Sequence, residues 1–255
     1  MVKILYEDNH LLVVVKPPDI PVQADISGAL DLLNLLKGYL KEKYNKPGEA
    51  YLGLVHRLDR PTGGVMVFAK TSKAAGRLSE QIRERLTGKT YLAVVSGIMT
   101  EKEGAFSDWL LKDTRTNMVK IVPPHTNGAK DAVLGYRVLE EREGLSLVSV
   151  RLLTGRGHQI RVQMAHHAAP IVGDRRYGKE TGPGPFSSSQ ERGKGLTQNP
   201  EDNESGRKGQ GPEEGMALWA YELSFAHPVK KEELIFSEPP PAKWPWNLFE
   251  VISSD

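Results

Sequence analysis

Strand-like and helix-like segments follow one another along this chain without the regular strand–helix alternation that builds a parallel sheet. Large apolar residues recur at three- and four-residue intervals over 29–45 and 72–87, which predicts two amphipathic helices, and a short helix is expected near 158–168. Apolar runs predict strands on both sides of Asp8–Asn9 and near 51–55, 64–70, 89–97, 132–140, 146–153 and 216–228. This order predicts an α+β fold with a mixed, mainly antiparallel central sheet and flanking helices.

The composition of the 255 residues is that of a globular chain, with 39% hydrophobic and 26% charged residues. No run approaches the roughly 18 apolar residues that a membrane span needs, and the N-terminus lacks the continuous apolar stretch of a signal peptide. We therefore expect a cytoplasmic protein without membrane contact. The absence of cysteine excludes disulfides, thiolate nucleophiles and cysteine-ligated metal centres.

One segment, 179–215, differs from the rest in composition. It contains eight glycines, and its only large apolar residues are Phe186 and Leu196. Such a segment cannot bury enough apolar surface to offset the conformational entropy lost on ordering. We predict a disordered insertion within a single domain spanning 1–255, because strand-like patterning resumes directly afterwards.

The net charge is only +2, but the basic residues are concentrated in two stretches. Between His56 and Tyr91 there are eight basic and three acidic residues, and between Arg151 and Lys179 there are six basic residues against Asp174 alone. Such stretches indicate either a polyanionic partner or two solvated surfaces, and charge alone does not decide between these.

The motifs of several enzyme classes are absent. The run GKT at 88–90 lacks the preceding glycine of a phosphate-binding loop, and neither a dinucleotide fingerprint nor the Gly-x-Ser-x-Gly elbow of a hydrolase occurs. His56, Asp59, His166 and His167 are candidate metal ligands for a histidine-based metallohydrolase. The two adjacent histidines are expected to point in different directions on a helix, so we predict no metal site.

The stretch HRLDRPTGGVMVFAK, residues 56–70, places one carboxylate, Asp59, between Arg57 and Arg60 and ahead of an apolar strand. An aspartate can act as a nucleophile or base without a cofactor if it is held ionised and aimed. An arginine within a few ångströms favours the ionised form of a carboxylate and can bind it with two hydrogen bonds. The partner could be Arg57, Arg60 or an arginine of the second basic stretch. In a purely structural role, Asp59 would cap the following turn.

Three motifs occur together: HRLDRPTGGVMVFAK, GKTYLAVVSG at 88–97, and LLTGRGHQIRVQMAHHAAPIVGDRRYG at 152–178. With the opening YEDNHLLVVVKPPDIPVQ and the later LSFAHP, they give a chain that resembles the RluA-type RNA pseudouridine synthases over most of its length. The resemblance implies an isomerase that converts uridine in RNA to pseudouridine, on a mixed α/β catalytic domain with a central antiparallel sheet. It also implies a reaction without metal or cofactor.

The resemblance implies a role for each matching residue. Asp59 matches the catalytic aspartate, whose attack on the ribose C1′ or on the uracil ring stays open, and Arg161 matches the arginine paired with it. Tyr91 matches the tyrosine that stacks on the target uracil and assists proton removal at C5, although a strand tyrosine can equally be a core residue. Arg57 matches the arginine that fills the gap left by the flipped base. The other residues expected to bind RNA are Arg60, Arg156, His158 and Gln159.

The chain departs from the family pattern at four positions. Hydroxyl residues are usual where Gly63 and Gly157 stand, and histidine is common where Gln163 and Trp219 stand. Loss of two hydroxyls could weaken phosphate contacts or helix capping by about 1 kcal/mol each. These departures concern rate and substrate rather than the chemistry.

We therefore predict a cofactor-independent RNA isomerase that acts as a monomer on ribosomal or transfer RNA, without indicating which uridine is modified. The family's catalytic opening begins at about Ile4, so no additional RNA-binding domain is expected before it. His56 and His158 are expected to form structural hydrogen bonds rather than to carry protons. The alternative is an RNA-binding ribosome-assembly factor with little or no modification activity.

Overall fold

Residues 2–25, 28–178 and 215–250 are described by the computed structural model of this chain. The strands are β1 Lys3–Glu7, β2 Leu11–Lys16, β3 Gly53–Leu54, β4 Gly63–Ala69, β5 Gly88–Ser96, β6 Glu103–Asp113, β7 Met118–Val122, β8 Lys130–Arg142, β9 Leu145–Leu152, β10 Leu218–Ala226 and β11 Glu233–Ser237. The helices are α1 Leu32–Lys43, α2 Ser72–Arg83, α3 Gln159–His166 and the 3-10 turn η1 Trp246–Leu248.

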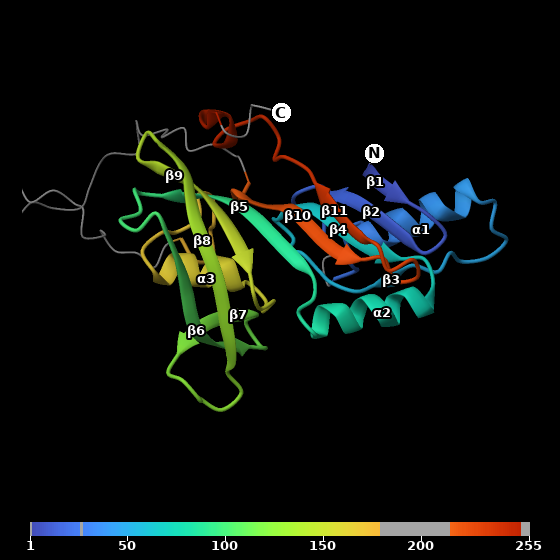
Figure 1. Ribbon diagram of the computed structural model, residues 1–255, viewed down its shortest axis with the longest axis horizontal. Helices are drawn as coiled ribbons and strands as arrows, with labels where there is room; N and C mark the ends of the chain where they lie inside the picture. The colour runs from blue at the N-terminus through green and yellow to red at the C-terminus, as the bar shows by residue number, and fades with distance from the viewer. Residues whose placement is uncertain (1, 26–27, 179–214, 251–255) are drawn as a thin grey trace, which may run out of the picture.

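These strands form one sheet with the order β1-β2-β4-β10-β5-β9-β8-β6-β7, and β3 and β11 pair additionally with β4 and β10 (Figure 1). Among the described strand pairs, β4 and β10 run parallel and the others antiparallel. The predicted mixed, mainly antiparallel sheet with flanking helices is therefore confirmed.

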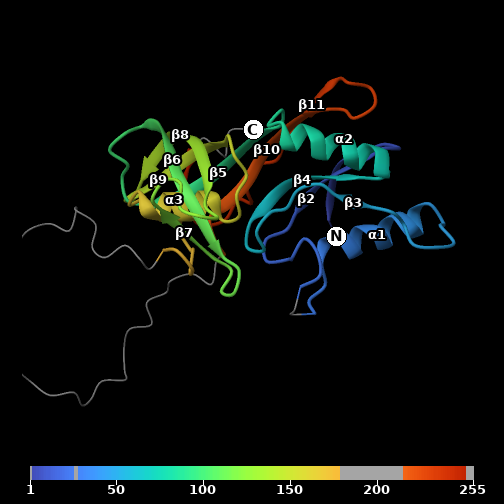
Figure 2. The same cartoon turned by 90° about the horizontal axis from the view of Figure 1, so that it is seen from below.

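The half of the sheet formed by β1, β2 and β4 has a helix on each face. In Figure 2, α2 lies on one side of β2 and β4, and α1 lies on the other. Every residue of β2 and β4 is buried, and successive side chains alternate between the faces. Leu12, Val14, Met66 and Phe68 share a core with α1, whereas Leu11, Val13, Val65 and Val67 share one with α2. Burial on both faces explains why these strands read as continuous apolar runs.

The second half of the sheet consists of β9, β8, β6 and β7, with α3 packed against β6 and β7. A small core with Leu110, Val119 and Val162 joins these three elements. The sequence did not predict β6 and β7. In β6 only Leu110 is buried, so the strand has no apolar alternation that would reveal it.

The helices are shorter than predicted, and local backbone chemistry sets their ends. Helix α1 begins at Leu32 because the carboxylate of Asp31 accepts a hydrogen bond of 2.9 Å from the amide of Asn34 and caps the helix. Helix α2 ends at Arg83, and Arg85 two residues later adopts a left-handed φ of 60° that a helix cannot continue through. The strand expected at 51–55 pairs only over β3.

The predicted insertion at 179–215 lies outside the described residues, apart from Gly215. Across the described part of the chain, none of the helices has the length and apolar character needed to cross a membrane.

Two of the departures noted above, Gly63 and Trp219, lie side by side in the sheet. They are partners in the parallel β4–β10 pair, and a Cβ atom at Gly63 would overlap the six-membered ring of Trp219, only 2.7 Å from Cε3. The indole is 6% exposed and donates a hydrogen bond of 2.8 Å to the carbonyl of Glu238. The indole thus occupies the space that a side chain at position 63 would need, so the two departures depend on each other.

We predict that Gly63→Ser lowers the free energy of unfolding by about 1–3 kcal/mol, the usual cost of overpacking a core. Trp219→His removes buried ring atoms and should cost about 3 kcal/mol. The double variant should lose less than the sum, by at least about 0.5 kcal/mol, because the smaller imidazole leaves room for serine. Urea denaturation of the four proteins measures this coupling, and strict additivity would contradict it.

Candidate active site

The loop between β3 and β4 carries Asp59 to the start of the buried strand β4. The amide of Thr62 donates a hydrogen bond of 3.0 Å to the carbonyl of Asp59 and closes a tight turn. Gly64 then passes against the backbone of Ala220, with a φ of 119° and a Cβ position only 2.6 Å from the Ala220 nitrogen. Glycine is required there, because any side chain would collide with β10.

A buried ammonium group holds this loop in place. Lys16, at the end of β2, is fully buried. Its Nζ donates to the carbonyl oxygens of Pro17 at 2.9 Å, Arg60 at 2.9 Å and Thr62 at 2.8 Å. Burial lowers the pKa of Lys16 to about 8. The sequence reasoning missed this residue, although a lysine directly after five apolar residues was an available signal.

Helix α3 brings Arg161 to Asp59 from the other half of the sheet. The Nη1 of Arg161 donates to Oδ2 of Asp59 at 3.1 Å. The Nε and Nη2 of the same guanidinium donate to the two carboxylate oxygens of Asp174, each at 2.8 Å. The side chains of Arg161 and Asp174 are 7% and 1% exposed, whereas that of Asp59 is 25% exposed. The expected contact between Asp59 and Arg161 is therefore present, and Asp59 is the accessible carboxylate of the pair.

Asp174 is a residue that the sequence reasoning missed. Its Oδ1 also accepts hydrogen bonds from the amides of Arg176 at 2.9 Å and Tyr177 at 3.2 Å. Burial opposes ionisation of Asp174, but Arg161 and these amides outweigh it and lower the pKa of this carboxyl group. Burial also opposes the charge of Arg161, whose pKa is nevertheless raised, first by Asp174 and then by Asp59. The available signal was a single acidic residue in an otherwise basic stretch.

His158 lies beside the Asp59 carboxylate, with its Nε2 at 3.9 Å from Oδ2. Its Nδ1 lies 2.7 Å from the hydroxyl of Tyr177, which also accepts a hydrogen bond of 3.0 Å from the amide of Val119. This leaves the Tyr177 proton for Nδ1 and favours the tautomer that carries its proton on Nε2, toward Asp59. Burial lowers the pKa of His158, although Asp59 acts in the opposite direction. The ring is therefore neutral at neutral pH.

Tyr91 lies on the central strand β5 and lines the same cleft as Asp59. Burial raises the pKa of the Tyr91 phenol well above its ordinary value, and the nearby carboxylate of Asp59 raises it further. The phenol therefore stays neutral at physiological pH. A neutral, partly buried ring is suited to stacking and poorly suited to taking up a proton.

The cleft has a volume of about 1850 Å³ and is lined by residues from both halves of the sheet. The residues predicted from the sequence that line it are Arg57, Asp59, Arg60, Tyr91, Arg156, His158 and Arg161. Further basic residues that line it are Arg83, Arg85, Lys89, Lys112, Arg151, Arg175 and Arg176, against the acidic residues Asp19, Asp25, Asp59 and Asp174. The cleft is thus predominantly basic, as expected of a surface that attracts a polyanion.

Gln159 does not line this cleft, although we expected it to bind RNA. Its side chain is buried, and its Oε1 accepts hydrogen bonds from the hydroxyl of Thr154 at 2.8 Å and the amide of Arg156 at 3.0 Å. Its Nε2 donates to the carbonyl of Val133 at 3.1 Å. Gln159 therefore holds the loop 154–159 together, and the structure gives no support to an RNA contact by its side chain.

The three other arginines expected to bind RNA differ in how they are held. Arg156 donates to the carbonyl of Asp131 at 2.8 Å and to its carboxylate at 2.7 Å. Arg60 donates to the carbonyl of Asp19 at 3.1 Å, and Arg57 is exposed. Because all three line the cleft, they contribute positive charge to it whether or not they contact RNA directly.

His56 forms a structural hydrogen bond, as predicted. Its Nε2 accepts from the amide of Val67 in β4 at 3.1 Å. Burial lowers the pKa of His56 to about 3, and Lys89 adds a smaller effect in the same direction. The ring is therefore neutral over the physiological range and available as an acceptor.

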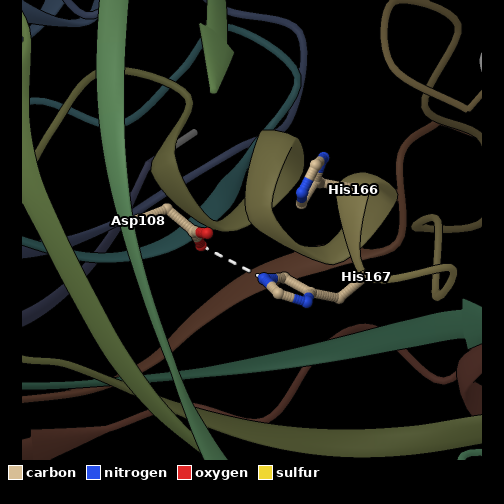
Figure 3. A group of neighbouring side chains, drawn as sticks. All are labelled: Asp108, His166 and His167. Carbon is tan, nitrogen blue, oxygen red and sulfur yellow. Dashed lines mark hydrogen bonds and ion pairs between the residues drawn. The ribbon is translucent and has the colours of Figure 1, made fainter. Parts of the chain in front are cut away.

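His166 and His167 were expected to point in different directions on a helix, and the structure places a nitrogen of each ring within 4.8 Å of the other. Helix α3 ends at His166, so His167 leaves the helix, and the two rings lie perpendicular with their centroids 5.1 Å apart (Figure 3). One nitrogen of each ring and an oxygen of Asp108 lie within 4.8 Å of one another. This group does not include His56 or Asp59, so it is not the metal group considered from the sequence.

A sequence profile described as RNA pseudouridylate synthase matches residues 10–166, which include Asp59, Tyr91 and Arg161. Ribosomal large subunit pseudouridine synthase D of Pasteurella multocida (strain Pm70) is 34% identical over 256 residues, covering 99% of this chain and 71% of that protein. The chain belongs to the RluA-type RNA pseudouridine synthases.

The matched share of two other curated relatives is smaller. Ribosomal large subunit pseudouridine synthase D of Xanthomonas campestris pv. campestris is 36% identical over 238 residues, which cover 93% of this chain and 66% of that protein. For synthase C of Buchnera aphidicola subsp. Baizongia pistaciae the matched part is 53% of the relative. The solved structure of Human RNA Pseudouridylate Synthase Domain Containing 4 superposes with a TM-score of 0.70 at 25% identity, covering 94% of this chain and 88% of that one.

The two remaining departures from the pattern of this pseudouridine synthase family have different structural settings. Gln163 is fully buried, and its Nε2 donates to Oδ2 of Asp108 at 2.6 Å and to the carbonyl of Ala132 at 3.2 Å. A Cβ atom at Gly157 would meet nothing within 4 Å. Nothing in the described structure explains why glycine stands there.

We predict that Asp174→Asn lowers the free energy of unfolding by about 3 kcal/mol or more, because it leaves the buried Arg161 cation without its main partner. Asp131→Asn is the matched control, since Asp131 pairs with arginines at a position where its side chain is 48% exposed. That variant should cost less than about 1 kcal/mol. Chemical denaturation compares the three proteins, and equal costs for both variants would contradict the role assigned to Asp174.

The lowered pKa of His56 predicts a pH dependence of stability. In the unfolded chain this histidine takes up a proton near pH 6.5, but in the folded protein only near pH 3, so the unfolded state binds more protons between these values. The contribution to stability is complete above pH 6.5 and is lost as the pH falls toward 3, by at most about 1.4 kcal/mol per pH unit. His56→Gln keeps an acceptor for Val67 and should remove this part of the slope. Urea titrations between pH 7 and pH 5 test this, and parallel curves for the two proteins would refute it.

Proposed function

We propose that this pseudouridine synthase isomerises specific uridines in RNA to pseudouridine, with Asp59 as the nucleophile. The observation that carries the proposal is the 3.1 Å ion pair between Arg161 and Asp59 inside a predominantly basic cleft. Asp174 binds the other edge of the guanidinium, so Arg161 offers Asp59 a fixed position. A quarter of the Asp59 side chain stays accessible for a substrate.

A stacked uridine has to leave its helix before it can reach this carboxylate, which costs a few kcal/mol. Phosphate contacts with the basic residues of the cleft offset part of this cost. Stacking of the uracil on Tyr91 contributes a further amount of roughly 1–3 kcal/mol. Arg57, exposed and lining the cleft, is proposed to fill the gap that the flipped base leaves.

In the proposed reaction the Asp59 carboxylate attacks the target nucleotide, at the ribose C1′ or at the uracil ring. The bond between C1′ and N1 breaks, the uracil turns while still bound, and a bond between C1′ and C5 replaces it. C5 then loses its proton, N1 gains one, and Asp59 is released as a carboxylate. The product is an isomer of the substrate, so the step balances without an oxidant or reductant.

The proposed contribution of Tyr91 is stacking rather than proton removal from C5. Its phenol has a raised pKa because it is buried and faces the Asp59 carboxylate, so the ionised form that would accept a proton is disfavoured. Of the two roles that the resemblance implied for Tyr91, the proposal keeps stacking on the uracil and leaves out proton removal.

Ribosomal RNA of the large subunit is the proposed substrate, because the relatives from Pasteurella and Xanthomonas carry that substrate in their names. Transfer RNA is the other substrate expected from the sequence. Either substrate would place the enzyme in the cytoplasm. The monomeric state stays a prediction.

We expect Asp59→Asn to slow pseudouridine formation by roughly 10⁴-fold or more, as the removal of a nucleophile does in other enzymes. RNA affinity should stay within about threefold of the wild type, since the basic residues of the cleft are unchanged. The measurement is chemical mapping of pseudouridine in total RNA from cells that lack the gene, complemented with either protein. Asp19→Asn changes another carboxylate that lines the cleft and serves as the matched control, which should restore every site.

Two outcomes would contradict this function. Restoration of every site by Asp59→Asn would show that the reaction does not need this carboxylate. A wild-type protein that restores growth or ribosome assembly, but no pseudouridine, would instead support an RNA-binding assembly factor.

A further inference from the structure

Three side chains outside the cleft have the composition of a metal site. Asp108 comes from β6, and His166 and His167 come from the C-terminal end of α3 (Figure 3). Each offers one ligand atom, and these atoms lie within 4.8 Å of one another. None of the three is among the residues that line the active-site cleft, and the proposed reaction does not use them.

The arrangement is close to that of a tetrahedral zinc site. Zinc binds histidine nitrogens and carboxylate oxygens at about 2.0–2.2 Å, which puts neighbouring ligand atoms about 3.3 Å apart. The Nε2 of His167 lies 3.2 Å from Oδ2 of Asp108, so one edge of such a tetrahedron is already formed. His166 is exposed, and its ligand nitrogen lies within 4.8 Å of the other two ligand atoms, so a change of its rotamer is required to complete the site.

Neighbouring side chains hold two of these ligands in place. The Nε2 of Gln163 donates to Oδ2 of Asp108 at 2.6 Å, and the ring of His167 stacks on Phe106, with centroids 3.9 Å apart and 9° between the planes. Contacts of this kind orient ligands in metalloproteins. The side chains of Asp108 and His167 are 11% and 33% exposed, so an ion here would keep one coordination position open to water.

We propose that Asp108, His166 and His167 bind a divalent transition-metal ion such as zinc, whose usual ligands include histidine and aspartate. Three protein ligands at the surface give weaker binding than a closed site with four ligands, so the expected Kd is micromolar. The bound ion joins β6 to the end of α3, the helix that carries Arg161. Its role is to stabilise this part of the fold, and the inference does not depend on the proposed reaction.

Isothermal titration of the full, untagged chain with zinc chloride, after treatment with a chelator, tests this site. The expected result is one ion per chain, with affinity reduced at least tenfold by His166→Ala and by His167→Ala. His125→Ala removes an exposed histidine between β7 and β8 and is the matched control, which should keep the wild-type Kd. Cobalt provides a second readout, because a tetrahedral cobalt complex absorbs visible light strongly. This absorption should appear with the wild type and be lost in both variants.

The melting temperature gives a readout that does not depend on titration heats. Zinc at about 100 times its Kd should raise it by about 5 °C or more in the wild type and the control, and by less in the two variants. A Kd above about 1 mM, or an affinity that neither variant changes, would overturn the proposal. Loss of binding in the His125 control would also overturn it, since the ion would then sit elsewhere.

Discussion

One guanidinium shared between two carboxylates determines how this candidate active site is built. Arg161 is buried, and a buried cation is costly unless its hydrogen-bonding groups are satisfied. Asp174 meets most of that requirement with two bonds of 2.8 Å, and backbone amides in turn fix Asp174. The remaining Nη1 is therefore available to Asp59, and this one hydrogen bond does not have to offset the whole cost of burying the guanidinium. Because Asp174 provides most of the hydrogen bonds to Arg161, Asp59 can be bound by Arg161 and still remain partly exposed.

The continuous sheet is what brings these groups together. Asp59 belongs to a loop of the half that contains β2 and β4, whereas Arg161 belongs to a helix packed on the second half. Strands β10 and β5 join the two halves, and Tyr91 lies on β5 between them. Because Lys16, at the end of β2, donates to two carbonyl oxygens of the Asp59 loop, those of Arg60 and Thr62, the loop is tied to the most buried part of the molecule.

The local sequence pattern was sufficient to predict the helices and strands that bury a regular face. The resemblance of the motifs was sufficient to predict the contact between Asp59 and Arg161. Strand β6 was missed because most of its side chains are exposed, and β7 is a short strand in which only Val119 is fully buried. Lys16 and Asp174 were missed for a different reason. Each stands out in its local sequence, but its partners are distant in the sequence or are backbone atoms, so its role cannot be read from a local pattern. Gln159 shows the opposite case. It lies inside a motif that predicted RNA binding, but its side chain forms hydrogen bonds within and next to its own loop.

The contact between Gly63 and Trp219 bears on how such a chain can evolve. Considered separately, Gly63 and Trp219 each replace a residue that is common in the family. In the structure, however, the indole of Trp219 occupies the volume that Gly63 leaves free. The two changes are therefore one exchange of volume across adjacent strands. A change at position 63 or at position 219 alone therefore leaves the interior crowded or hollow, whereas a change at both positions keeps the total volume closer to constant.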